Sequence, residues 1–275
     1  MSHKTNPIGV FDSGYGGLTV LAEFFETLPE YDFYYLGDNA RSPYGPRSFD
    51  TVYAYTLQAV KKLFEMRCQL VILACNTASA KALRTIQQND LPLIDSYRRV
   101  LGVIRPSAEV IGLYTKSNNI GILGTTGTVI SESYPLEIKK IYPDIVVTQE
   151  ACPMWVPLVE NNEHKNQGAD YFIEKNIKSL IIKNKNIDTI ILGCTHFPLL
   201  IDKIRKYVPE NIKIVSQGKI VADSLKDYLN RHPEMDERCS KNGKRRFFTT
   251  ESIDIFMERA QLFCNQIENI EHLEL

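Results

Sequence analysis

The chain has 275 residues, of which 44% are hydrophobic and 24% are charged, and its formal net charge at pH 7 is −1. This composition is typical of a globular protein, and the length suits two modest domains. The near-zero net charge gives no support for a nucleic-acid or membrane surface. No stretch approaches the ~18 consecutive apolar residues of a membrane span, and the first residues lack the apolar core of a signal peptide. We therefore expect a cytoplasmic protein without nucleic-acid or membrane partners.

Short apolar runs and amphipathic segments alternate in the first part of the chain. Strands are predicted at 8–12, 33–36, 70–73 and 100–104, and Arg105-Pro106 is expected to close the last of them. Helices are predicted at 18–28, 49–66 and from 76 through 84, where apolar residues recur at helical spacing. Two prolines and two glycines between 37 and 46 indicate a fixed loop.

The same alternation continues in the second part. Strands are predicted at 120–123, 145–148, 189–192 and 212–215, the last of these returning the chain to the first unit. Helices are predicted after Thr128, at 169–183, after Pro198 and at 253–264. The polar stretch 231–246 is interpreted as a solvated loop before a strand at 247–250. Strands that alternate with helices in this way predict parallel sheets.

Two motifs occur once in each half, in the same order. The segment LACNTA at 73–78 resembles LGCTHF at 192–197, and IGVFDSG at 8–14 resembles IGILGTT at 120–126. The offsets between the copies are 194 − 75 = 119 and 120 − 8 = 112. The predicted fold is therefore α/β, with two pseudo-symmetric domains of mostly parallel sheets. We expect one domain to contain residues 1–105 plus 214–275 and the other to contain residues 106–213.

The cysteines of the repeated motif, Cys75 and Cys194, each follow a buried strand and precede a helix. Open α/β sheets bind ligands at such strand ends, and the N–H groups at a helix start favour thiolate. Two thiols related by internal symmetry indicate a pair facing each other across a cleft. Inversion at one carbon needs such a pair, because one group removes a proton and the other delivers a proton to the opposite face. Cys68 and Cys264 are instead interpreted as small buried apolar residues.

Three polar residues lie close to these motifs. Asp12 is either the N-cap of the next helix or a carboxylate that meets a substrate ammonium or supports a thiol. A phosphate cradle is disfavoured, because the glycines after Asp12 fit neither a GxGxxG nor a GK[ST] loop. His196 and Glu160 are interpreted as partners of Cys194, with a structural Glu160 as the alternative. Zinc is disfavoured because closely paired ligand motifs are missing, and we expect no metal.

Five segments together carry a family resemblance. They are FDSGYGGLTV at 11–20, GDNARSPYG at 37–45, ACNTAS at 74–79, Cys152-Pro153 with VPLVE at 156–160, and GCTHFP at 193–198. In this order they closely resemble the bacterial glutamate racemases, from about residue 8 to residue 215. The combination is highly specific, whereas each segment alone would be weak.

The resemblance implies a cofactor-independent enzyme that interconverts L- and D-glutamate with two acid/base thiols and supplies D-glutamate for peptidoglycan cell-wall biosynthesis. It implies two α/β domains with an interdomain active site, usually as a homodimer. Cys75 and Cys194 would be the catalytic thiols, supported by Asp12, Glu160 and His196. The substrate-binding residues that it implies are Asp12, Ser13, Tyr44, Gly45, Asn76, Thr77, Thr125, Thr195 and His196.

Three segments depart from the family pattern. Residues 94–106 are longer than the usual counterpart and carry Arg105 where an acid is common. Trp155 replaces a smaller aromatic residue, and 216–218 (Ser-Gln-Gly) replace a more usual acidic start. These differences bear on domain packing, dimer geometry and effector control, while the catalytic positions are intact.

Two other functions are compatible with parts of the pattern. Aspartate and hydantoin racemases share the two-cysteine arrangement, and one methylene separates glutamate from aspartate. A two-domain solute-binding protein without chemistry belongs to a different class. Such proteins are normally exported, and the two thiols would then be unexplained.

Overall fold

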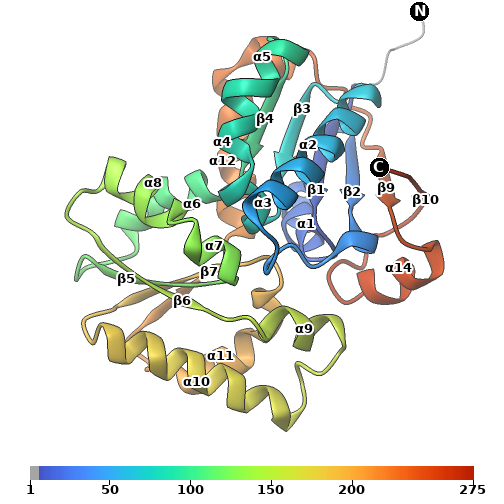
Figure 1. The fold of residues 1–275 in the computed structure, drawn as a ribbon. Coiled ribbons are helices and arrows are strands. Elements are labelled where there is room, and N and C mark those ends of the chain that lie inside the picture. Colours follow the sequence, from blue (N-terminus) through green and yellow to red (C-terminus); the bar gives the residue numbers. More distant parts are fainter. Residues whose placement is uncertain (1–5) are drawn as a thin grey trace, which may run out of the picture.

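Two parallel sheets, each flanked by helices, form the computed structural model, which describes residues 6–275 (Figure 1). The first sheet has the order β10-β9-β2-β1-β3-β4, and the second has the order β6-β5-β7-β8. The strands of the first sheet are β1 (Ile8–Asp12), β2 (Phe33–Gly37), β3 (Leu70–Leu73), β4 (Arg99–Gly102), β9 (Arg245–Thr249) and β10 (Ile270–His272). Those of the second are β5 (Asn119–Gly124), β6 (Val146–Ala151), β7 (Thr189–Gly193) and β8 (Lys213–Val215).

The helices alternate with the strands along the chain. They are α1 (Gly17–Thr27), α2 (Phe49–Glu65), α3 (Asn76–Lys81), α4 (Leu83–Thr85), α5 (Leu91–Ile94), α6 (Ile104–Val110), α7 (Thr126–Ile130), α8 (Ser133–Ile141), α9 (Trp155–Glu160), α10 (Gln167–Lys183), α11 (Ile201–Tyr207), α12 (Gly218–Arg231), α13 (Pro233–Asp236) and α14 (Ile253–Ala260). Shorter turns are η1 (Asn39–Arg41), η3 (Ile111–Leu113), η4 (Phe197–Leu200) and the π-helical η2 (Ile86–Asp90). Within residues 6–275 no helix has both the length and the apolar character needed to span a membrane.

The two sheets repeat one strand order. In the first sheet β2-β1-β3-β4 are neighbours, and in the second β6-β5-β7-β8 occupy the equivalent positions. Every one of these pairs is parallel. In each sheet the chain runs from the first strand to the neighbour on one side, and its next strand lies on the other side, so the strand order reverses at the central pair. Open α/β sheets bind ligands at such a switch point. The prediction of two related α/β units is confirmed.

Alternate residues of the central strands face opposite layers of helices. Ile8 and Val10 of β1 belong to the core under α1, whereas Phe11 belongs to the core under α2. The apolar stripe of α1 includes Leu18 and Phe24, which are fully buried. Each such side chain contributes roughly 1.5–3 kcal/mol on burial, so these faces fix the helices on the sheet.

Residues 99–106 differ from the prediction. Strand β4 ends at Gly102, and α6 begins at Ile104, so Arg105 and Pro106 lie in the first turn of a helix. Proline is tolerated there because the first N–H groups of a helix have no intrahelical partner. The helical segment after Cys75 also runs beyond residue 84, through η2 and α5 to Ile94.

The return to the first sheet occurs later than predicted. Strand β8 pairs with β7, so residues 213–215 belong to the second sheet. Helix α12 packs against α1, and β9 then pairs with β2 in the first sheet. The proposed boundary between residues 213 and 214 thus falls inside β8, and the boundary between 105 and 106 falls inside α6. The assignment of whole segments to two domains stays a prediction.

The polar stretch 231–246 has a defined structure. It contains α13, and its backbone is held by Asp32, which accepts hydrogen bonds from the backbone N–H groups of Asn242 (3.0 Å) and Lys244 (2.8 Å). Strand β9 starts at Arg245, two residues before the predicted start at 247. Residues 237–244 form a loop before β9, as expected, and 241–244 are exposed, but the stretch also contains α13 and is anchored by the buried Asp32 carboxylate.

Candidate active site

The two cysteines of the repeated motif occupy equivalent positions. Cys75 follows β3 and is the N-cap of α3, where its Sγ accepts a hydrogen bond from the N–H of Ala78 (3.4 Å). Cys194 directly follows β7 but is not a helix cap, because residues 195–196 form a turn before η4, whose N-cap is His196. The helix start predicted after Cys194 is therefore a turn and a short 3₁₀ segment. Both side chains are buried, and the strands that precede them belong to different sheets.

The Cys75 thiol is held mainly in its protonated form. Burial and the nearby Asp12 carboxylate raise its pKa to about 12, against the hydrogen bonds from Ser13 and the Ala78 N–H. The Ser13 Oγ lies 3.3 Å from Sγ. A lowered pKa was expected from the helix start, and this expectation is wrong for Cys75. Loss of hydration outweighs the favourable N–H groups, so a nearby cation is needed to favour the thiolate.

Cys194 is the start of a hydrogen-bonded series. Its Sγ lies 4.0 Å from Nδ1 of His196, and Nε2 of His196 lies 3.0 Å from Oε1 of Glu160 at the end of α9. Burial alone lowers the pKa of His196, but the hydrogen bonds to Cys194 and Glu160 dominate and raise it to about 10. His196 is therefore an imidazolium near neutral pH, and its positive charge lies beside the Cys194 side chain.

Asp12 lies between the two thiol environments. Its Oδ1 accepts a hydrogen bond from the N–H of Gly14 (2.8 Å), while Oδ2 is buried without a partner among the described residues. Burial raises the pKa of Asp12, and the His196 charge and the N–H groups of Gly14 and Gly17 oppose this effect. The N-cap position of α1 is Gly16, so the alternative role of Asp12 as that N-cap is excluded.

The glycine-rich turn after Asp12 packs against the loop that follows β7 of the second sheet. A Cβ atom on Gly16 would lie 2.1 Å from Oγ1 of Thr195 and 2.4 Å from Nδ1 of His196. Thr19, one turn later, donates from Oγ1 to the carbonyl of Thr195 (3.0 Å). Glycine is required at position 16 because any side chain would displace the loop that carries Cys194.

The remaining predicted substrate-binding residues form contacts across the same interface. Oγ1 of Thr77 lies 2.9 Å from Oγ1 of Thr125, and the N–H of Gly127 donates to the carbonyl of Gly45 (2.9 Å). The hydroxyl of Tyr44 donates its hydrogen to buried Asp38, so it cannot donate to a ligand carboxylate. A contact of Tyr44 with a ligand carboxylate would therefore have to come from its backbone.

Two residues near Cys75 were not predicted as part of the site. The hydroxyl of Tyr134 donates to Oδ1 of Asn76 (2.7 Å), and Nε2 of Gln217 donates to the same hydroxyl (2.6 Å). In the sequence Tyr134 looked like one apolar position of a helix, and position 217 stood out only as a departure from an acidic pattern. A third residue, Phe263, packs edge-on against His196 with 5.2 Å between ring centroids. No sequence signal pointed to it.

Trp155, another departure from the family pattern, lies in the hydrophobic core. Its ring is buried at 4.7 Å from the ring of Phe197, measured between centroids, and its Nε1 donates to the carbonyl of Phe172 (3.5 Å). The larger aromatic residue therefore packs under the segment that follows Cys194 and His196.

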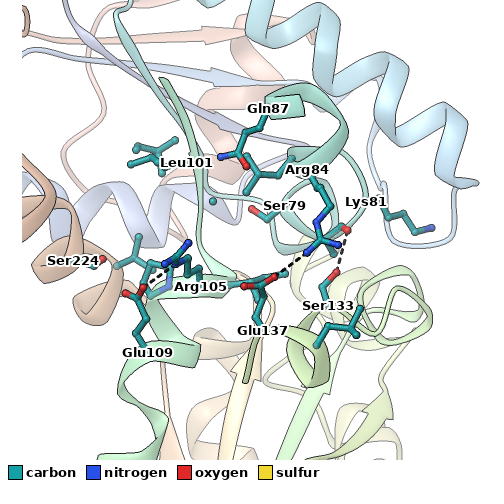
Figure 2. Close-up of a pocket in the computed structure, with 18 of the residues that line it drawn as sticks. Ser79, Lys81, Arg84, Gln87, Leu101, Arg105, Glu109, Ser133, Glu137 and Ser224 are labelled. Carbon is teal, nitrogen blue, oxygen red and sulfur yellow. Dashed lines mark hydrogen bonds and ion pairs between the residues drawn. The ribbon is translucent and has the colours of Figure 1, made fainter. Parts of the chain in front are cut away.

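A separate cavity of about 680 Å³ lies between the sheets on α3, α6, α8 and α12 (Figure 2). Figure 2 shows Arg84 pointing toward Glu137 and Arg105 toward Glu109, at 3.4 Å and 2.8 Å respectively. None of the predicted site residues lines this cavity. Arg105, where an acid is common in the family, is thus a residue of this second cavity rather than of the thiol site.

Among residues 6–275, no three His, Cys, Asp or Glu side chains are grouped as they would be around a metal ion. The polar groups that surround the thiols are hydroxyls, one imidazole, two carboxylates and backbone N–H groups. This donor set suits an organic ion with carboxylates and an ammonium group.

Comparison with known proteins places the chain in a family. A sequence profile described as Asp/Glu/Hydantoin racemase matches residues 18–225. The chain belongs to this racemase family. The glutamate racemase of Listeria monocytogenes (serotype 4a, strain HCC23) is 37% identical over 270 residues, which cover 98% of each protein. As a racemase, the chain is an enzyme of the isomerase class.

Solved structures of racemases share the complete fold. Glutamate racemase isoform RacE1 from Bacillus anthracis superimposes with a TM-score of 0.89 at 33% identity, covering 99% of each chain. A glutamate racemase from Francisella tularensis subsp. tularensis SCHU S4, solved in complex with D-glutamate, gives a TM-score of 0.85 at 27% identity, covering 98% of each chain. The likeness covers both sheets and the interface that contains the thiols.

Proposed function

We propose that this racemase interconverts L- and D-glutamate, with Cys75 and Cys194 as its acid/base pair. The observation that supports this most is the placement of two buried thiols at equivalent strand ends of two related sheets, each with its own polar partners. The names of the Listeria and Bacillus relatives and the D-glutamate complex of the Francisella relative support glutamate as the substrate.

The proposed mechanism removes the α-proton on one face and adds a proton on the other. Cys75 takes the proton from D-glutamate and Cys194 takes it from L-glutamate, and the opposite thiol acts as the acid in each direction. The substrate ammonium, beside Asp12, would lower the pKa of the buried Cys75 thiol when bound. In the other half, the imidazolium of His196, held by Glu160, is the neighbour of Cys194.

The substrate carboxylates would be held by the hydroxyl and amide groups at the sheet ends. The candidates are the side chains of Ser13, Asn76, Thr77, Thr125 and Thr195 with the backbone of Tyr44 and Gly45. The reaction would need neither a metal nor an organic cofactor. We further propose a cytoplasmic homodimer that supplies D-glutamate for peptidoglycan.

The test is racemisation of L-glutamate by the purified chain in deuterated water, followed by circular dichroism and mass spectrometry. We expect deuterium at Cα of the newly formed enantiomer, because protons taken by one thiol are replaced by solvent protons from the other. Product without solvent label would contradict the two-thiol mechanism. Activity lost on chelation and restored by a divalent ion would contradict the metal-free reaction.

Aspartate is the second candidate substrate, since the matched profile covers aspartate racemases as well. A missing methylene in a fitted site costs roughly 10–200-fold in kcat/KM. We therefore expect glutamate to be preferred by at least about tenfold over aspartate in the same assay. Equal kcat/KM values for the two acids would favour a broader racemase.

A further inference from the structure

Gln217 is buried at the junction of three segments of the chain. It precedes α12, and its Nε2 lies within hydrogen-bond distance of the hydroxyl of Tyr134 on α8 (2.6 Å), Oγ of Ser107 on α6 (2.7 Å) and the carbonyl of Val103 (3.2 Å). The amide therefore joins the connection between the sheets to a helix of the second unit, next to the thiol site.

The direction of these hydrogen bonds follows from the groups involved. The Val103 carbonyl can only accept, so it favours the nitrogen rather than the oxygen of the Gln217 amide on this side. The two hydrogens of this nitrogen are directed to the nearer oxygens, those of Ser107 and Tyr134, and Ser107 donates its own hydrogen to the Val103 carbonyl (3.4 Å). Tyr134 also accepts from Gln217, and its single hydroxyl hydrogen is directed to Oδ1 of Asn76.

This direction determines which end of the Asn76 carboxamide faces the site. With Oδ1 engaged by Tyr134, the NH₂ group points away from that contact, and Nδ2 is buried without a partner in the described part of the chain. A buried, unpartnered donor next to Cys75 is suited to a substrate carboxylate. The ring of Tyr134 also lies against Gly193, since a Cβ there would be 3.1 Å from its Cε2.

We propose that Gln217 is a positioning residue that acts through Tyr134 to orient the carboxamide of Asn76 toward the substrate. The proposal rests on the proposed function of the thiol site. A carboxylate at position 217 could only accept hydrogen bonds, so Tyr134 would donate to it instead. Tyr134 would then accept from the NH₂ group of Asn76, and Oδ1 would turn toward the negatively charged substrate.

The first experiment compares Gln217→Glu and Gln217→Met with the wild type in both directions of racemisation. For Gln217→Glu we expect KM to rise and kcat/KM to fall by about tenfold or more, because a hydrogen bond to a charged group is lost. The loss should deepen with rising pH as the introduced carboxyl ionises. Gln217→Met removes the donor that holds Tyr134 without offering it an acceptor, so its KM should rise less than that of Gln217→Glu, by about threefold.

The second experiment tests whether the effect passes through Tyr134. In a double-mutant cycle, Gln217→Glu should have little further effect on kcat/KM when Tyr134→Phe is already present. Ser133→Ala is the matched control, because Ser133 Oγ donates across the same interface to the carbonyl of Ala80 on α3 (3.1 Å). It should leave KM unchanged.

The outcomes separate this proposal from simpler ones. Equal KM values for wild type and Gln217→Glu, or additive effects in the cycle, would overturn the role of Gln217. An equal rise of KM in Ser133→Ala would assign the effect to domain docking instead. If Gln217→Glu does not fold, the cycle of Gln217→Met with Tyr134→Phe, read from KM, takes its place, and additivity there would overturn the role. A wild type without glutamate racemisation would contradict the proposed function itself.

Discussion

Oε1 of Glu160 lies 3.0 Å from Nε2 of His196, whose other ring nitrogen faces Sγ of Cys194. Within residues 6–275 no such series accompanies Cys75, which has Ser13 at 3.3 Å and the charge of Asp12 nearby. Two thiols at equivalent positions thus have unlike neighbours. Under the proposed mechanism, internal symmetry would supply the opposed pair, and the different neighbours would tune each thiol for its own enantiomer.

Removal of either thiol should stop racemisation in both directions. Because inversion needs an acid and a base on opposite faces, Cys75→Ala and Cys194→Ala should each lower kcat by at least about 10²–10⁴-fold. Cys68→Ala, which removes a buried thiol from the core under α2, is the control and should remain active. Polarimetry with each enantiomer measures this. Near-normal rates in either of the first two variants would refute the paired roles.

His196→Asn should affect the two directions unequally. The loss of the imidazolium should lower kcat more for L- to D-glutamate, in which Cys194 is the base, than for the reverse. The two kcat/KM values must fall by the same factor, because the equilibrium constant is fixed. Initial rates from each pure enantiomer test this. Equal losses of kcat in both directions would show that His196 does not act on one thiol selectively.

The same histidine predicts a pH-dependent stability. Its pKa is raised from the ordinary 6.5 to about 10 in the folded chain. The contribution of its charge is therefore fully present below about 6.5 and is lost as the pH rises through about 10. The difference in unfolding free energy between wild type and His196→Asn, from urea titrations, should shrink over this range. A difference that grows with pH would contradict the assignment.

Gly16→Ala should impair catalysis through the loop that carries Cys194. The new methyl group would lie 2.1 Å from Oγ1 of Thr195, so the loop must shift. A shift of about 1 Å in the position of a reacting group costs about 10²-fold in rate. Gly168→Ala on α10 is the control, because a Cβ there meets nothing within 4 Å. Comparable kcat values for both variants would argue against the close contact.

Asp32→Asn should destabilise the connection between α12 and β9. Burial raises the pKa of Asp32, but hydrogen bonds from Ser240, Asn242 and Lys244 outweigh this effect and lower it. We expect a loss of about 2–3 kcal/mol at neutral pH, which disappears as the pH falls below the ordinary value of 3.8. Exposed Asp144→Asn should change little. A pH-independent loss would point to packing rather than charge.

Much of the fold could be predicted because local patterns were consistent with it. The spacing of apolar residues predicted helices at 49–66 and 169–183, and these are confirmed as α2 and α10. The repeat around Cys75 and Cys194 predicted two related units, since similar motifs recur in the same order. Such signals are local, so they need no knowledge of what packs against them.

Where segments change partner, the sequence was a poorer guide. Residues 213–215 read as a strand in any sheet, and only pairing with β7 assigns them to the second. Arg105 and Pro106 are compatible with a strand end and with a first helical turn. Whether these residues end a strand or begin a helix depends on packing between α6 and α8, which are separated in sequence.

By itself the sequence determined the α/β class, the repeat and the candidate thiols, because strand ends and helix starts are encoded by neighbouring residues. Only the tertiary structure decided the surroundings of those thiols. Burial and Asp12 raise the pKa of Cys75 against its helix start, and Gln217 reaches Asn76 through Tyr134 from 141 residues further along the chain (217 − 76 = 141). Desolvation and long-range hydrogen bonds arise when distant segments meet, so no local pattern could predict them.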